Sequence, residues 1–347
     1  MPSARNWVTW SFALAVATIA GAPSAAHACD ICAVYTATEQ SESRPGPRFG
    51  VATQYTHFGT LQNGSEEVPN PFGQRLDSVI TQVVLGWQLV PRLGVQLNLP
   101  FIYRDFRRIE NGRGTDGTVG GFGDMSLLAN ALAYSAPVGE QGLFRLNLLG
   151  GLKLPTGDSA LLAEELDEDG HAHAAAGVSA AHVFRPRHVT GPGAAAGTEN
   201  AVHGHDLALG SGSVDGLVGG DLLLSWRRVF FSGLLQYAIR GEGSFDYRYA
   251  NDLVFAAGPG VWAWLGHEST LAVQAVFSGE TKGNDTLAGE PADDTAVTML
   301  YLGPRLTGTW ETSWSAELAA DLPVLRHNTA LQVVPDYRIR AAAVWRF

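Results

Sequence analysis

The sequence predicts an all-β protein, a transmembrane antiparallel β-barrel of about 12 strands with a long His-rich outer loop. Three observations predict this class. Side chains alternate between apolar and polar over successive segments, short turns alternate with long loops, and no apolar run of spanning length follows the N-terminus. Outer-membrane barrels combine these features, because one face of each strand meets lipid and the other meets the lumen.

The segment 337–347 shows the alternation most directly. One face carries an apolar, aromatic-ended set: Tyr337, Ile339, Ala341, Ala343, Trp345 and Phe347. The opposite face carries three arginines, Arg338, Arg340 and Arg346. A soluble core would not accept these arginines, whereas a barrel lumen can. The final Phe347 also resembles the aromatic signature by which bacterial outer-membrane barrels are recognised for insertion.

Residues 1–28 are expected to be a secretory signal peptide. Arg5 supplies the positive start, an apolar stretch covers 7–19, and Ala26-His27-Ala28 forms an A-x-A cleavage site. The mature chain then begins with a periplasmic leader, 29–47, before a barrel that spans 48–347. Acylation of Cys29 is the alternative, and the poor lipobox match of the residues before it makes simple cleavage the preferred expectation.

Cys29 and Cys32 form a C-x-x-C pair within this leader. A local disulfide is the simplest expectation in an oxidising periplasm. A haem c site needs histidine directly after the second cysteine, where this chain has Ala33. A thiolate metal site and a redox contact with a periplasmic partner stay open as alternatives.

The composition suits a barrel in a lipid membrane. Charged residues make up 16% of the chain, and 41 glycines and 9 tryptophans fit glycine-punctuated strands with aromatic residues at the membrane interfaces. The net charge of -11 excludes nucleic acid as a partner, because phosphates would be repelled. Outer-membrane lipid is the expected surrounding partner.

The first half of the chain yields five strands in order. They are predicted at 48–58, 78–89, 93–104, 122–135 and 144–154. The second and third are separated by a turn too short for anything but a hairpin. A polar loop precedes the second strand, and a Gly-rich loop is predicted over 107–121. A long extracellular loop, 155–210, follows the fifth strand.

The second half supplies the remaining strands. Predicted strands at 211–226 and 229–240 are joined by Arg227-Arg228, and two further pairs surround short turns at 266–268 and 311–313. An even count returns both termini to the periplasm. The alternation is ambiguous near 262–264, where Trp262 and Trp264 share a face opposite Val261. A soluble β-sandwich is the alternative, disfavoured because its inner face should not carry so many charges.

Two short motifs flank the long loop: Leu152-Lys153-Leu154-Pro155-Thr156-Gly157-Asp158 and Leu209-Gly210-Ser211-Gly212-Ser213-Val214-Asp215. They resemble a family of outer-membrane proteins named for the meta-pathway of phenol degradation. That resemblance implies a channel-like barrel, loosely similar to the FadL-type transporters of hydrophobic compounds.

The long loop gathers six of the ten histidines of the chain. They are His171, His173, His182, His188, His203 and His205. His171 and His173, and likewise His203 and His205, are separated by a single residue. Either pair could bring two imidazoles to one zinc, copper or nickel ion, so metal capture is one expectation. The other is an Ala/Gly-rich loop whose histidines are merely solvated.

The predicted lumen face carries many charges. The candidates are Arg104, Arg145, Lys153, Asp215, Asp221, Arg240, Glu317, Asp321, Arg338 and Arg340. One interpretation is a mutually neutralising ladder that stabilises the wall. The other is a selective path for a small solute, and both stay open at this point.

The sequence therefore predicts a porin-like outer-membrane channel or transporter for small molecules, with metal ions or hydrophobic compounds as cargo. The alternatives are a barrel that docks a periplasmic redox or cytochrome partner and a metal-capturing surface protein. No enzyme is expected, because the chain has no G-x-S-x-G elbow and the serines near Gly210 suit a strand entry.

Overall fold

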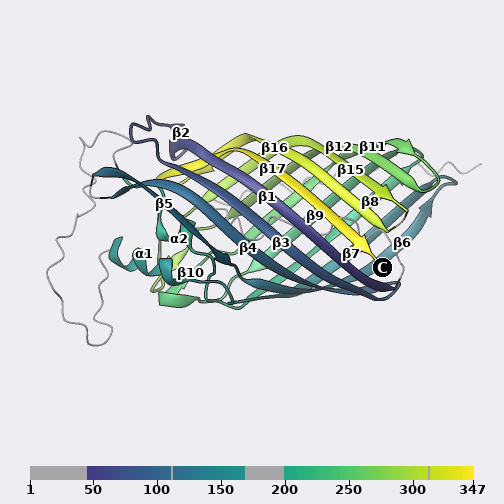
Figure 1. The fold of residues 1–347 in the computed structure, drawn as a ribbon, viewed down its shortest axis with the longest axis horizontal. Helices are drawn as coiled ribbons and strands as arrows, with labels where there is room; N and C mark the ends of the chain where they lie inside the picture. Colours follow the sequence, from purple (N-terminus) through teal and green to yellow (C-terminus); the bar gives the residue numbers. More distant parts are fainter. Residues whose placement is uncertain (1–44, 111, 169–198, 312) are drawn as a thin grey trace, which may run out of the picture.

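The computed structural model describes residues 45–110, 112–168, 199–311 and 313–347, which form a closed antiparallel barrel (Figure 1). Its 12 wall strands are β1 (Gly46–Asn63), β3 (Arg75–Val90), β4 (Leu93–Glu110), β6 (Met125–Val138), β7 (Gly142–Leu154), β8 (Asp215–Trp226), β9 (Val229–Ile239), β11 (Asp252–Leu265), β12 (Ser269–Lys282), β15 (Val297–Trp310), β16 (Trp314–Asn328) and β17 (Leu331–Arg346). Each pairs with the next, and β17 pairs back onto β1. The predicted all-β barrel of about 12 strands and the closing role of the last strand are confirmed, whereas residues 169–198 of the predicted His-rich outer loop lie outside the described residues.

The two ends of the barrel differ. At one end the wall strands are joined by short turns. At the other, the loops carry η1 (Ala160–Leu162), α1 (Ala163–Glu168), α2 (Gly204–Leu207), η2 (Ser244–Asp246) and the short strands β2 (Glu66–Glu67), β10 (Tyr247–Arg248), β13 (Thr286–Leu287) and β14 (Glu290–Pro291). Figure 1 shows α1, α2 and β10 together at this long-loop end. Outer-membrane barrels place short turns toward the periplasm and long loops outside.

The outward face of the wall is an apolar belt. Phe101, Leu148 and Leu318 are 48%, 53% and 52% exposed, on three different strands. Exposed apolar surface on this scale is unusual in water and is expected where lipid covers the wall. On β4 the belt ends sharply, since the outward residues change from Tyr103 to Asp105 along the strand. No helix among the described residues is long and apolar enough to cross a membrane.

The tryptophans mark one edge of this belt. Seven of the 9 lie in the barrel, and all of them stand near the short turns: Trp87, Trp226, Trp262, Trp264, Trp310, Trp314 and Trp345. The other two, Trp7 and Trp10, fall within the expected signal peptide. Tryptophan favours the membrane–water interface, so this ring of side chains places the interface at the short-turn end.

The predicted Gly-rich loop over 107–121 is wrong for most of its length. β4 continues to Glu110, and β5 (Arg113–Phe122) pairs with it as a hairpin. The glycines make room for rings across the hairpin: a Cβ on Gly117 would lie 2.5 Å from Cζ of Phe106. Glycine in this stretch therefore indicates close cross-strand packing, not a flexible connection.

Two other strand boundaries also differ from expectation. β8 begins at Asp215, four residues after the predicted start, because the preceding serines turn into the barrel. In β11 a register shift between Trp262 and Trp264 resolves the ambiguous alternation. Trp262 packs on Phe230, with ring centroids 4.6 Å apart, whereas Trp264 is exposed. The bulge turns Trp264 to the lipid side.

Candidate functional site in the barrel interior

A break in the wall organises one side of the interior. β5 ends at Phe122 and β6 begins at Met125, and the two residues between them belong to neither strand. Gly123 stays attached to β4 by donating its N–H to the carbonyl of Pro100 at 3.0 Å. A Cβ at this position would lie 2.8 Å from Cδ1 of Ile102. The close approach requires glycine, and it lets the buried Asp124 turn inward.

Asp124 is the point on which both flanking motifs converge. Its carboxylate accepts hydrogen bonds from the backbone N–H of Gly157 at 3.0 Å and of Ser211 at 2.9 Å. It also pairs with the ammonium of Lys153 at 2.6 Å. Thr156 secures the other side of the break by accepting the N–H of Met125 at 2.8 Å. The motifs therefore tie the ends of the long loop to the wall.

Asp124 begins a chain of alternating charges that crosses neighbouring strands. Lys153 lies 2.9 Å from Asp215, and Asp215 lies 2.7 Å from Arg240. Arg240 also pairs with Asp252. The five side chains are at most 4% exposed. Buried charges are tolerated only when paired and hydrogen-bonded, so removing one member should strongly destabilise the rest.

A second set of ion pairs lines β12, β15, β16 and β17. Glu280 accepts hydrogen bonds from Arg338 at 2.8 Å and from the hydroxyl of Tyr301 at 3.0 Å. Arg340 donates to both carboxylate oxygens of Asp321, at 2.9 and 3.0 Å. Bidentate pairing of this kind fixes both side chains. These contacts fit the neutralising-ladder interpretation of the lumen charges.

The remaining predicted lumen residues also have partners. Arg104 donates to the backbone carbonyls of Asp206 and Ala208. Asp221 accepts from the amide of Asn147 at 2.8 Å, with Arg145 nearby as a favourable charge. Glu317 faces Arg305 at 3.5 Å. Sequence reasoning missed Asp124 and Asp252, because the first follows a strand break and the second stands at a strand start.

Part of the inner wall also presents apolar side chains to the interior. Ala52, Ile80, Val84, Ile102 and Val344, here called the luminal apolar strip, come from β1, β3, β4 and β17 and are at most 5% exposed. Cross-strand register places Ile80 beside Ile102. Leu209 from the long loop packs against the strip. The interior therefore combines networks of paired charges with an apolar cluster on part of β1, β3, β4 and β17.

The described ends of the long loop, 155–168 and 199–214, fold into the long-loop end of the barrel and are called the outer plug. Val202 and Leu207 pack with wall residues, Leu61 and Leu76 among them. Gln74 of the β1–β3 loop holds the plug through its amide, which donates to the carbonyl of Glu199 and accepts from the N–H of Ala201, both at 2.9 Å.

Two buried histidines lie in the outer plug. Nε2 of His203 lies 3.0 Å from the carbonyl of Asn200, and its Nδ1 lies 3.0 Å from a carboxylate oxygen of Asp294. His205 faces Glu165 at 3.1 Å through Nδ1 and Asp206 at 3.4 Å through Nε2. One nitrogen of each ring donates a hydrogen bond, Nε2 of His203 to the carbonyl and Nδ1 of His205 to Glu165, and the other nitrogen of each ring faces a carboxylate. The carboxylates around His205 favour its imidazolium form.

Electrostatics in the plug agree with this assignment. Burial alone would lower the pKa of His205, but the carboxylates of Asp206 and Glu165 outweigh burial and raise that pKa to about 9. Burial alone would raise the pKa of Asp294, but the hydrogen bond from His203 holds it well below its usual range. The plug is thus secured by the His205 contacts within the β7–β8 loop and by the contact of His203 with Asp294 in the loop before β15.

Comparison with known proteins adds the context of the fold. No known family and no curated sequence matches the chain. A solved structure, the COG4313 outer membrane channel from Pseudomonas putida F1, is similar over 90% of this chain and 100% of that chain, with a TM-score of 0.56 and 15% identity. The chain has the fold of a bacterial outer-membrane barrel. At this identity the likeness concerns the fold alone.

Other outer-membrane barrels resemble this one more distantly. A FadL homologue from Pseudomonas aeruginosa has a TM-score of 0.36 and 9% identity, covering 87% of this chain and 90% of that chain. The CymD monoaromatic hydrocarbon channel has a TM-score of 0.35 and 7% identity, covering 88% and 89%. Similarity at this level carries no argument about cargo.

The structure does not gather the predicted metal ligands that it describes. No group of three or more histidine, cysteine or acidic side chains suited to a metal ion occurs in the described part of the barrel. His203 and His205 lie with ring centroids 5.5 Å apart and direct their nitrogens at carboxylates and a carbonyl. The other predicted sites lie outside the described residues: the signal peptide, Cys29, Cys32, His171, His173, His182 and His188.

The serines of the second motif have a structural role in this outer-membrane barrel. Ser211 donates to Asp124, and Ser213 donates to Asp215 at 2.6 Å, with both serines buried. A serine that donates to a carboxylate is not activated as a nucleophile. Ser65 contacts His327 at 2.5 Å on the exposed outer rim, and no carboxylate is bonded to that histidine among the described residues. An orienting third group is thus not evident there.

Proposed function

We propose that this outer-membrane barrel is a channel for small hydrophobic molecules. The luminal apolar strip carries the proposal, because a wall that conducts only ions or sugars has no need of a cluster of apolar side chains on its inner face. The likeness in fold to an outer membrane channel supports the general class. The resemblance of the two loop motifs to the phenol-degradation family supports the same cargo.

The binding free energy expected for a small apolar molecule on the strip is low enough for the molecule to pass through. Burying about 100 Å² of a small apolar molecule contributes about 2.5 kcal/mol at roughly 25 cal/mol per Å². That is less than the about 4 kcal/mol of a millimolar dissociation constant, so the cargo would be held briefly and released. The charges of the lumen are already paired with one another and therefore offer little to an ion.

Uptake of a small apolar probe into vesicles that contain the mature protein tests the proposal. Val84→Asp places a carboxylate in the luminal apolar strip and is expected to lower uptake at least tenfold, a loss of about 1.4 kcal/mol. Gln236→Asp adds the same group at a polar luminal position and serves as the matched control. Heat-modifiable migration in gels confirms that both variants are folded.

Equal uptake by both variants would contradict the assignment of cargo to the strip. A protein that raises salt conductance strongly and leaves apolar uptake unchanged would instead be an ion channel. Metal ions as cargo depend on six histidines, of which the structure describes only His203 and His205, and no metal-binding group occurs among the described residues. Docking of a periplasmic redox partner depends on Cys29 and Cys32, which lie outside them.

A further inference from the structure

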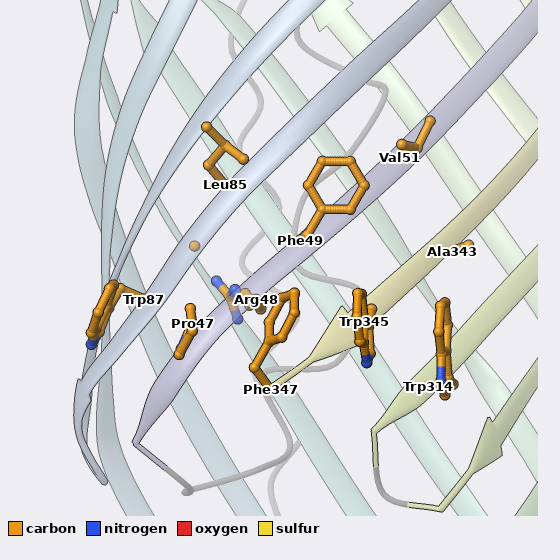
Figure 2. A pocket seen from close by; sticks show the side chains of 11 residues that line it. Pro47, Arg48, Phe49, Val51, Leu85, Trp87, Trp314, Ala343, Trp345 and Phe347 are labelled. Carbon is orange, nitrogen blue, oxygen red and sulfur yellow. The ribbon is translucent and has the colours of Figure 1, made fainter.

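The luminal apolar strip is covered in this structure, since its five side chains are at most 5% exposed. The outer side of the same wall carries an apolar groove where β1 meets β17, and Figure 2 shows Val51 and Leu85 at this groove. Side chains alternate along a strand, so their neighbours Ala52 and Val84 point into the barrel. A cargo molecule can therefore reach these inward side chains only after the group that covers them has moved.

Leu209 of the outer plug lies on the strip. Its side chain belongs to the same apolar cluster as Ile80, Ile102 and Val344, and it is 4% exposed. The other buried members of this cluster come from the wall strands β1, β3, β4 and β17. Leu209 thus makes the kind of contact with the wall that an apolar cargo molecule would make in its place.

Glycines make room for Leu209. A Cβ on Gly121, which pairs in register with Ile102, would lie 3.0 Å from Cδ1 of Leu209. A Cβ on Gly157 would lie 2.6 Å from the carbonyl oxygen of Leu209. The plug backbone can come this close to its neighbours because both positions have no side chain. The surrounding chain is therefore shaped to receive the leucine.

A few hydrogen bonds hold the backbone around Leu209. The N–H groups of Leu209 and Gly210 both donate to the carbonyl of Asp158, at 2.9 Å each. From the wall, the guanidinium of Arg104 donates to the carbonyl of Ala208 at 3.0 Å. These bonds are not part of a strand ladder, so the segment can leave the strip while the wall stays paired.

We propose that Leu209 competes with cargo for the strip, and that a compact hydrocarbon opens the plug by displacing this side chain. The inference rests on the proposed function, because it takes the strip as the surface that cargo contacts. A ligand shifts such an equilibrium only through its different affinity for the two states. A hydrocarbon can replace the apolar contacts that Leu209 gives up, whereas a sugar or an ion cannot. The plug therefore opens to the molecules that the channel carries.

Hydrogen exchange of the mature protein in lipid nanodiscs, with and without cyclohexane, tests the displacement. Cyclohexane is expected to speed exchange of the Leu209 and Gly210 amides about tenfold in the wild type, because displacement breaks both bonds to Asp158. Glucose at the same concentration is expected to leave exchange unchanged. Leu209→Ala removes the competing side chain, so its plug is expected to exchange faster from the start and to show no response to cyclohexane.

Leu207→Ala is the matched control. It removes the same buried side chain from the same segment, but from the cluster with Leu61 and Leu76 instead of the strip. This variant keeps Leu209 and is expected to keep the response to cyclohexane. Equal responses in the two variants, or wild-type exchange that cyclohexane leaves unchanged or slows, would overturn the proposal.

Val84→Asp separates this inference from the proposed function. If that variant takes up the apolar probe as well as the wild type does, the strip is not the path of the cargo and both proposals fail. If it loses uptake while cyclohexane has no effect on wild-type exchange, the channel function stands and displacement of Leu209 alone is refuted.

Discussion

His205 illustrates how single residues secure the outer plug. Its ring is buried between Glu165 on α1 and Asp206 on its own helix, and it stacks on Tyr247 with centroids 6.3 Å apart. His203 lies beside it, and the hydroxyl of Tyr249 donates to the His205 carbonyl at 3.0 Å. One protonated ring therefore joins the two ends of the β7–β8 loop to the loop between β9 and β11.

We predict that the plug loosens as pH rises. The folded-state pKa of His205, about 9, lies above the ordinary histidine value of 6.5. The stabilisation is therefore fully present below about pH 6.5 and is lost as pH rises through about 9. Its upper limit is about 3 kcal/mol. Hydrogen exchange of residues 199–214 should show the loss between these values.

His205→Gln should show the same loosening already at pH 7, because a neutral amide cannot replace the imidazolium. His267→Gln, in a short turn at the other end of the barrel, is the matched control. Comparison of variants at one pH cancels the intrinsic pH dependence of exchange. Protection of residues 199–214 that stays constant up to pH 10 would show that His205 does not secure the plug.

At the scale of elements, the break between β5 and β6 allows a side chain to turn into the barrel at a point where a continuous strand would keep its alternation. It directs Asp124 inward while Gly123 keeps its bond to β4. The two motifs that flank the long loop then meet on this carboxylate. The motifs are therefore best explained as anchors of the loop ends to the wall.

Asp124→Ala is expected to destabilise the barrel by about 3–5 kcal/mol, because it removes one of the two carboxylates that neutralise the buried Lys153 and the acceptor of the Ser211 N–H. Asp158→Ala is the matched control within the same motif. Asp158 is exposed and accepts only the N–H of Ala160 at 2.9 Å through its side chain, so its loss should cost about 1 kcal/mol. Denaturant unfolding followed by tryptophan fluorescence measures both, and equal losses would refute the anchoring role.

At the scale of the molecule, the barrel combines a lipid-facing belt, an interior with paired charges and an apolar cluster, and a plug at the long-loop end. Gln74, fully buried, joins plug and wall through two hydrogen bonds. Release of the outer plug from the wall, rather than a change in the wall itself, is therefore expected to widen the passage through the barrel. The plug's contacts with the wall and with the other loops are side-chain contacts rather than a continuous ladder of strand hydrogen bonds, so the plug can open locally while the wall stays paired.

Gln74→Ala is expected to raise the single-channel conductance in planar bilayers at least severalfold. Loss of two hydrogen bonds costs about 1–3 kcal/mol, which favours release of the plug. Gln88→Ala, which removes a bond of 2.8 Å to the Val90 carbonyl at the short-turn end, should leave the conductance unchanged. If the two variants conduct alike, the plug does not limit the passage.

Particular segments show how far sequence reasoning reaches. The alternation in 337–347 correctly predicted a wall strand, and the short connection at 90–92 correctly predicted a hairpin. The glycines of 107–121 were misread, because their partners are rings on the neighbouring strand. The luminal apolar strip was also missed: Ile80 and Val84 sit among residues that are apolar on both faces of β3, so alternation cannot separate them.

The sequence by itself determined the barrel, its even strand count and the lipid-facing side of most strands, because a period of two is a local property of an extended chain. Only the tertiary structure decided that Asp124 meets Ser211, that His205 faces Glu165, and that a groove forms where β1 meets β17. These contacts join residues far apart in the chain. They depend on register and closure, which local periodicity does not encode.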